Sequence, residues 1–140
     1  MTFLSPHFTL EELIASQTAV RTGIKEQFDP SPIVVTNLTL LCVECLEKVR
    51  QAWGHPLHIS SGYRCPRLNK AIGGSTTSSH MNGEAADIDL GSRERNQALY
   101  LKILESGIEF DQLINEYDFS WVHISYRRNN NRKQTLIIKK

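Results

Sequence analysis

Two histidines and one aspartate have the residue types and spacing best suited to bind a metal ion. His80 and Asp87 stand seven positions apart in the segment SSHMNGEAAD, residues 78–87. Asn82-Gly83 is a turn signal, and the AADIDL run that follows is typical of a short strand. Such a strand can carry Asp87 back beside His80.

A second histidine, His123, lies in WVHISY, residues 121–126. The alternation of this segment predicts a strand with Trp121, His123 and Ser125 on one face. Two imidazoles and one carboxylate form a three-ligand set that suits Zn2+ and leaves one position open for water. Iron(II) is the chemical alternative, but its two-histidine sites typically use His-x-Asp/Glu, so the spacing here favours zinc.

Each of these residues also has an ordinary structural explanation when taken alone. A single histidine is more often a hydrogen-bonded structural residue than a ligand, and an aspartate can cap a turn or form a salt bridge. Taken together, the three predict a metal site. His7, His55 and His58 have no comparable context, although His58 could lie behind the ligands.

Three segments resemble the zinc D-Ala-D-Ala carboxypeptidase family (peptidase family M15, subfamily A). Residues 78–87 match its S-x-H-x-x-G-x-A-x-D motif, and WVH at 121–123 is similar to its later W-x-H element. SSGYRCPRLN at 60–69 resembles its S-G-Y-R-x-x-x-x-N segment. The resemblance extends from about Leu57 to Tyr126.

This resemblance implies a hedgehog/DD-peptidase-like fold with one zinc bound by His80, Asp87 and His123. It also implies that Arg64 and Ser78 help to hold the substrate. A guanidinium can clamp a carboxylate through two parallel hydrogen bonds, which suits a peptide with a free carboxylate. The simpler alternatives are a surface salt bridge for Arg64 and a backbone-capping role for Ser78.

The general base is where the chain departs from the family pattern. Family members carry an acid three residues before the second histidine, and here that residue is Ser120. The carboxylates in the preceding segment are Asp111, Glu116 and Asp118. If strands 110–116 and 121–126 pair through a short loop, Glu116 lies opposite Trp121 and faces the same side as His123. We therefore predict Glu116 as the base, with Asp118, folding over from the loop, as the second candidate.

The 140 residues suit a single domain, residues 1–140, and 40% hydrophobic with 22% charged residues is typical of a globular protein. We expect a monomer. No transmembrane segment or signal peptide is visible, so we expect cytoplasmic synthesis with release to the cell wall by another route, as in phage-type lysins.

The formal net charge is +1, but residues 127–140 carry six bases and no acid. We interpret this end as a solvated terminal hairpin; attraction to an anionic surface is the alternative.

Two of the three cysteines, Cys42 and Cys45, fall on the apolar stripe of a long helix predicted from about Val34 to Trp53, before Gly54. We interpret them as core thiols. A redox or metal-binding Cys-x-x-Cys is the alternative, but the chain offers no second pair to complete a zinc site.

The remaining pattern predicts an α+β fold, with helices packed on a small, mainly antiparallel sheet. Thr9 and Glu12 form a capping box for a short helix through about Ser16. The other predicted helices are 67–72 and 93–106, and the other predicted strands are 57–60, 110–116 and 134–138.

The function expected from these features is zinc-dependent hydrolysis of peptidoglycan stem peptides, by a carboxypeptidase or an endopeptidase. The alternative from another class is a catalytically weak, zinc-containing binding module for cell wall or protein, since the hedgehog signalling domain resembles the same family. A nucleic-acid partner is not expected, because no basic patch interleaved with aromatic residues is present.

Overall fold

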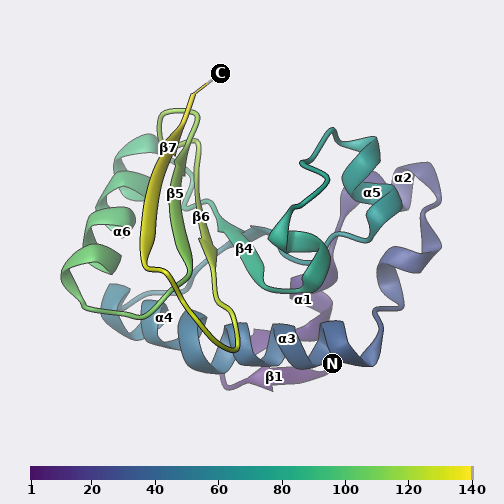
Figure 1. Ribbon diagram of the computed structural model, residues 1–140, viewed down its shortest axis with the longest axis horizontal. Coiled ribbons are helices and arrows are strands. Elements are labelled where there is room, and N and C mark those ends of the chain that lie inside the picture. The colour runs from purple at the N-terminus through teal and green to yellow at the C-terminus, as the bar shows by residue number, and fades with distance from the viewer. Residues whose placement is uncertain (140) are drawn as a thin grey trace.

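The computed structural model describes residues 1–139, in which helices pack around a five-stranded, mainly antiparallel sheet (Figure 1), and β1 (Phe3–Ser5) and β2 (Phe8–Thr9) form a separate two-stranded sheet. The predicted α+β class is confirmed. The strands follow the order β3-β4-β6-β5-β7 across the five-stranded sheet. Their bounds are β3 Ile59–Ser61, β4 Ala85–Ile88, β5 Gln112–Glu116, β6 Trp121–Ser125 and β7 Gln134–Ile138.

The C-terminal strand does not form the hairpin expected for the basic end of the chain. Instead, β7 passes β6 and pairs in parallel with β5, with Gln134 beside Gln112. The register is set just before the strand, where Lys133 N donates to Phe110 O at 3.0 Å. The expectation was wrong because a local pattern predicts a strand but not its neighbour in the sheet.

The long predicted helix is present and begins slightly earlier than expected. It comprises α3 (Pro32–Leu41), a π-helical turn η2 (Cys42–Leu46) and α4 (Glu47–Trp53). Both Cys42 and Cys45 are buried in η2, and burial raises the pKa of each thiol to about 12. These thiols are therefore unreactive core groups, and the Cys-x-x-Cys alternative is not supported.

The remaining elements complete the shell around the sheet. They are β1 (Phe3–Ser5), β2 (Phe8–Thr9), α1 (Leu10–Ile14), α2 (Gln17–Thr22), η1 (Lys25–Phe28), α5 (Pro66–Ala71), η3 (Ser79–Asn82) and α6 (Arg93–Glu105). The Thr9 side chain caps α1 by accepting from Glu12 N, which is the Thr9 half of the predicted capping box. No helix within residues 1–139 has the length and apolar character needed to cross a membrane.

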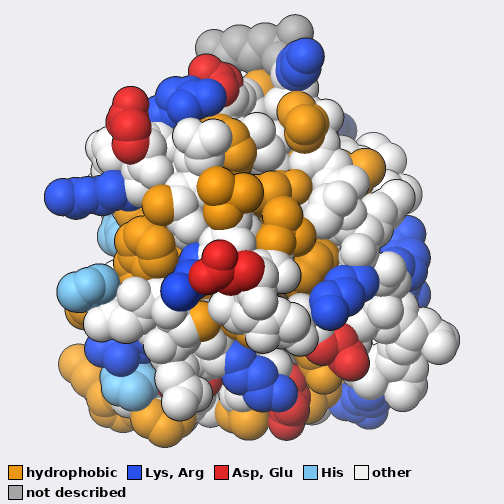
Figure 2. All heavy atoms as spheres, turned by 90° about the vertical axis from the view of Figure 1, so that its left-hand side faces the viewer, with side chains coloured by type: hydrophobic (Ala, Val, Ile, Leu, Met, Phe, Trp, Pro, Cys, Tyr) orange, Lys and Arg blue, Asp and Glu red, His pale blue; other side chains and the backbone are white. Residues whose placement is uncertain are grey.

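The two faces of the sheet have different roles. On one face, Val122 and Ile124 are fully buried, as are Leu99 and Ile103 of α6, which packs against β6. The outer side of α6 carries the exposed Leu101 and Leu104, and Figure 2, viewed from this side, shows hydrophobic side chains mixed with charged ones. In Figure 1 the other face of the sheet looks toward η3 and α5.

Candidate metal centre

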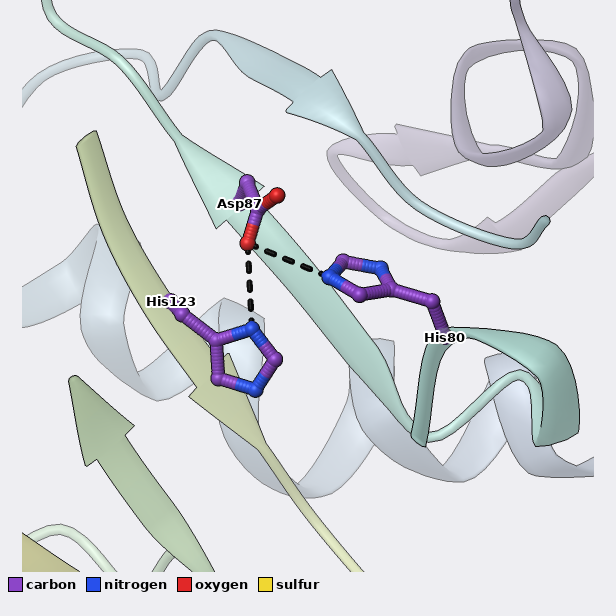
Figure 3. A group of neighbouring side chains, drawn as sticks. All are labelled: His80, Asp87 and His123. Carbon is purple, nitrogen blue, oxygen red and sulfur yellow. Dashed lines mark hydrogen bonds and ion pairs between the residues drawn. The ribbon is translucent and has the colours of Figure 1, made fainter. Parts of the chain in front are cut away.

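The three predicted ligands come together from three elements on the face of the sheet opposite α6. Asp87 on β4 is the direct cross-strand partner of His123 on β6, and His80 reaches them from η3 (Figure 3). Between them, Gly83 ends η3 with φ +75° and turns the chain into β4. A Cβ at Gly83 would lie 2.8 Å from Val34 O, so the turn requires glycine for both conformation and space.

One carboxylate oxygen is shared by the two imidazoles. Asp87 Oδ1 lies 3.2 Å from His80 Nε2 and 3.1 Å from His123 Nδ1. The ligand atoms of the three residues all lie within 4.8 Å of one another. The residues are also well buried, with exposed fractions of 2% for His80, 8% for Asp87 and 6% for His123.

The hydrogen bonding of this group favours a cation at its centre. His80 Nδ1 lies 2.7 Å from Gly62 O, and since a carbonyl can only accept, Nδ1 carries the hydrogen. The other ring nitrogen, Nε2, lies toward Asp87 Oδ1, and in the tautomer with hydrogen on Nδ1 it is the atom that can bind a metal. Burial works to raise the pKa of Asp87, but the two histidines lower it overall, so the carboxylate stays ionised.

A lone pair facing a buried carboxylate is stabilised when a cation bridges them. His123 Nε2 is buried and has no hydrogen-bond partner among residues 1–139, so the protein does not use the full bonding capacity of this ring. Two imidazole nitrogens and one carboxylate oxygen are a donor set that zinc prefers, and the Gly62 carbonyl supplies the usual orienting contact behind a histidine ligand.

A cleft of about 900 Å³ runs over this face of the sheet along the direction of the strands. His80, Asp87 and His123 lie on its wall. On the side of the metal centre that lies toward the turn between β5 and β6, the cleft is lined by Glu116, Tyr117 and Trp121. At the opposite end it is lined by Glu84, Asp111, Arg127 and Arg132. The centre is therefore accessible to an extended ligand from both sides.

Glu116 is in the register expected from the sequence. It pairs directly with Trp121, and the next paired position on the same face joins Ile114 to His123. Burial, together with the nearby charge of Asp87, raises the pKa of Glu116, with His123 and Trp121 opposing the rise. A half-buried carboxylate with a raised pKa on the metal side of the sheet is suited to accept a proton.

Asp118 does not fold over the site as expected for the second candidate. Its side chain is 74% exposed and pairs with Arg93 at the start of α6, with Oδ1 2.9 Å from Arg93 Nη2. This contact lowers the pKa of Asp118, and the residue is not part of the cleft wall. Ser120 is also unsuited to accept a proton, because its hydroxyl is exposed and donates to Tyr117 O at 2.7 Å.

The turn between Glu116 and Trp121 has an unusual backbone. Tyr117, Asp118 and Phe119 all have positive φ values, 53°, 55° and 58°, which is uncommon for residues other than glycine. Two asparagines hold this turn: Asn115 Oδ1 accepts from Phe119 N, and Asn96 Nδ2 donates to the carbonyls of residues 119 and 120. Strain held in place by buried hydrogen bonds is typical of functional sites.

Arg64 and Ser78 lie beside each other on the cleft wall. Arg64 Nη2 is 3.4 Å from Ser78 Oγ, and Arg64 N donates to His80 O, which ties the arginine segment to η3. Burial lowers the pKa of Arg64, while Asp87 and Glu116 oppose the change. Within residues 1–139 the guanidinium forms no ion pair, and its Nε is buried without a hydrogen-bond partner. The surface salt bridge considered for Arg64 is therefore absent from this part of the chain.

Several residues that shape the site were not singled out by sequence reasoning. Gln27 is fully buried and binds the backbone on both sides of Arg64, and Arg127 and Arg132 flank Asp111 in the cleft. The basic composition of residues 127–140 was the only sequence feature that could have indicated a role for the two arginines. No local sequence pattern indicated the role of Gln27. His58 is exposed and lies 3.2 Å from Asp89 O through Nδ1, so it does not support the ligands.

An α+β fold with a buried two-histidine, one-carboxylate centre in a cleft defines a zinc metallopeptidase type of site. A family model described as Peptidase M15 matches residues 6–125, most of the chain. The chain therefore belongs to the peptidase M15 family, whose members are zinc-dependent, and His80, Asp87 and His123 are the residues that can hold the metal. No curated protein matches it significantly.

Proposed function

We propose that this M15 metallopeptidase hydrolyses peptidoglycan stem peptides, as a D,D-carboxypeptidase or as a murein endopeptidase. The observation that carries the proposal is Arg64, a part-buried guanidinium on the cleft wall with no ion-pair partner in residues 1–139. Stem peptides carry free carboxylates close to their D-alanyl bonds. The resemblance of residues 60–69 and 78–87 to the D-Ala-D-Ala carboxypeptidase motifs supports the same substrate class.

In the proposed reaction, His80, Asp87 and His123 would hold a zinc ion, which would supply Lewis acidity toward the scissile carbonyl and toward water. Glu116 accepts a proton from the attacking water and delivers it to the leaving amine. Arg64 binds the substrate carboxylate through its planar fork, and Ser78 Oγ adds a hydrogen bond to the same group. The raised pKa of Glu116 makes its ionised carboxylate a stronger base for the first of these proton transfers.

The direct test incubates the zinc-loaded protein with muropeptides, with and without a chelator, and identifies products by mass. Release of a terminal D-alanine identifies a carboxypeptidase, and cleavage within a stem or cross-link identifies an endopeptidase. We expect Glu116→Gln to retain zinc and fold but to lose a factor on the order of 10² or more in turnover. Asp118→Asn is the matched control, since Asp118 lies outside the cleft wall, and it should keep near-normal turnover.

One result would overturn the proposed function, and a second would overturn the role of Glu116. Binding of muropeptides without any chelator-sensitive product would identify a zinc-containing binding module instead of a peptidase. Near-normal hydrolysis by Glu116→Gln would remove Glu116 as the base, and a collapse in Asp118→Asn would transfer that role to Asp118.

A further inference from the structure

The end of the cleft formed by the start of β5 and the end of β6 carries two arginines and two acids. Asp111 is engaged by Arg132 through three hydrogen bonds: Oδ1 accepts from Arg132 N at 3.1 Å and Nε at 3.0 Å, and Oδ2 accepts from Nη2 at 2.8 Å. Asp111 is almost fully buried, and Arg132 is the main cause of its lowered pKa. The charges of this pair therefore balance each other.

Arg127 is positioned differently from Arg132. Its backbone is held on both sides by Asn131, whose Oδ1 accepts from Arg127 N and whose Nδ2 donates to Arg127 O, each at 2.8 Å. Its guanidinium, in contrast, approaches Asp111 Oδ1 only to 3.7 Å and forms no hydrogen bond within residues 1–139. Arg127 lines the cleft. A fixed backbone with unused guanidinium donors is suited to bind a carboxylate.

Glu84 lies at the same end of the cleft. Its carbonyl accepts from Tyr126 N at 2.9 Å, which places it beside the residue that precedes Arg127. The Glu84 carboxylate is half-buried, lines the cleft and forms no ion pair within 4.0 Å among residues 1–139. In this described part of the chain Glu84 has no ion pair, and Arg127 has only the 3.7 Å contact with Asp111, whose carboxylate already accepts three hydrogen bonds from Arg132. An anion and a cation that both line the cleft with bonding capacity left over match a ligand group that carries both charges.

We propose that Arg127 and Glu84 form a subsite for an amino-acid zwitterion on the substrate: the guanidinium binds its carboxylate and Glu84 binds its ammonium. The ligand class is a peptide that contains a diamino-dicarboxylic acid. The free end of that side chain carries an ammonium and a carboxylate on the same carbon. This inference rests on the proposed function, since it assigns the residue that the cleft selects in a stem peptide.

The distance from the metal centre is compatible with this assignment. Arg127 follows His123 by four positions in the chain, so their Cα atoms are at most about 14 Å apart. An extended peptide advances about 3.3 Å per residue, and a long diamino-acid side chain adds several more ångströms. A zwitterion on a residue one or two positions from the scissile amide can therefore reach Arg127.

The test uses two stem peptides that are identical except for one residue, 2,6-diaminopimelyl in one and lysyl in the other. Both keep the side-chain ammonium, and only the first has the side-chain carboxylate. Binding to the zinc-loaded protein is measured by titration calorimetry, and mass spectrometry of the same samples reports hydrolysis. We expect the parent protein to bind the diaminopimelyl peptide about tenfold or more tightly, the effect of a hydrogen-bonded charge pair.

Three variants assign the contacts. Arg127→Gln should abolish the preference and leave lysyl-peptide binding unchanged, while Glu84→Gln should weaken both peptides and keep the preference. Arg128→Gln is the matched control, because Arg128 is exposed and does not line the cleft. A purely structural role for Arg127 would weaken both peptides equally.

The outcomes separate the two proposals. A preference lost only in Arg127→Gln, without hydrolysis of either peptide, would support the subsite and overturn the peptidase function proposed above. Equal binding of the two peptides by the parent protein, a preference that persists in Arg127→Gln, or no binding of either peptide would overturn the subsite.

Discussion

Gln27 lies behind the cleft wall and is expected to contribute more to stability than most polar residues of the protein. Its side chain is fully buried in η1 and connects two other parts of the chain. Nε2 donates to Ile14 O and Tyr63 O, and Oε1 accepts from Cys65 N, all at 2.8 Å. The bonds to Tyr63 O and from Cys65 N lie on either side of Arg64. The Gln27 amide therefore fixes the position of the backbone that carries the Arg64 side chain.

The proposed perturbation is Gln27→Met, which nearly preserves length and volume but removes every hydrogen bond of the side chain. It leaves two carbonyls and one N–H buried without a partner. Each unsatisfied group costs about 1–3 kcal/mol, so we expect the free energy of unfolding to fall by about 3 kcal/mol or more. A total stability of about 5–15 kcal/mol makes this a large fraction.

The assay is urea unfolding of the zinc-saturated protein, so that metal binding contributes equally to parent and variant. With a slope of about 1–3 kcal/mol per molar urea, the midpoint should move down by about 1–3 M. Gln51→Met on α4 is the matched control, because Gln51 is exposed, and it should shift the midpoint little. A loss below about 1 kcal/mol in Gln27→Met would show that these bonds do not hold the segment.

Three further predictions concern the metal centre and the cleft. His80→Ala should lose zinc, while the exposed His58→Ala keeps it; metal analysis showing the reverse would refute the ligand assignment. Arg64→Lys should keep zinc but lose roughly tenfold or more in kcat/KM, because the point charge of lysine does not replace the planar guanidinium. Equal kcat/KM in the variant and the parent would refute the proposal that Arg64 binds the substrate carboxylate through two parallel hydrogen bonds. Burial and Asp87 raise the pKa of Glu116, and the ionised form is the base, so kcat/KM should rise with pH through a midpoint above the ordinary value of 4.5; a midpoint at or below 4.5 would contradict this role.

The sequence by itself determined the metal centre and the side of the sheet on which Glu116 lies. His80 and Asp87 are joined by a short turn and strand whose residues specify their own geometry, with Asn82-Gly83 reversing the chain. The link between β5 and β6 is only four residues long, which fixes the pairing of Glu116 with Trp121. Strand alternation then places His123 on the same face.

Only the tertiary structure decided the contacts between distant segments and the directions of side chains outside regular strands. Asp118 pairs with Arg93 of α6, and β7 pairs with β5 directly after the segment in which Arg132 contacts Asp111. Gln27 binds the Cys65 backbone across 38 positions of sequence. A periodic pattern specifies which face of an element is buried, whereas partners far apart in the chain are set by how the elements pack, and no local residue pattern encodes that choice.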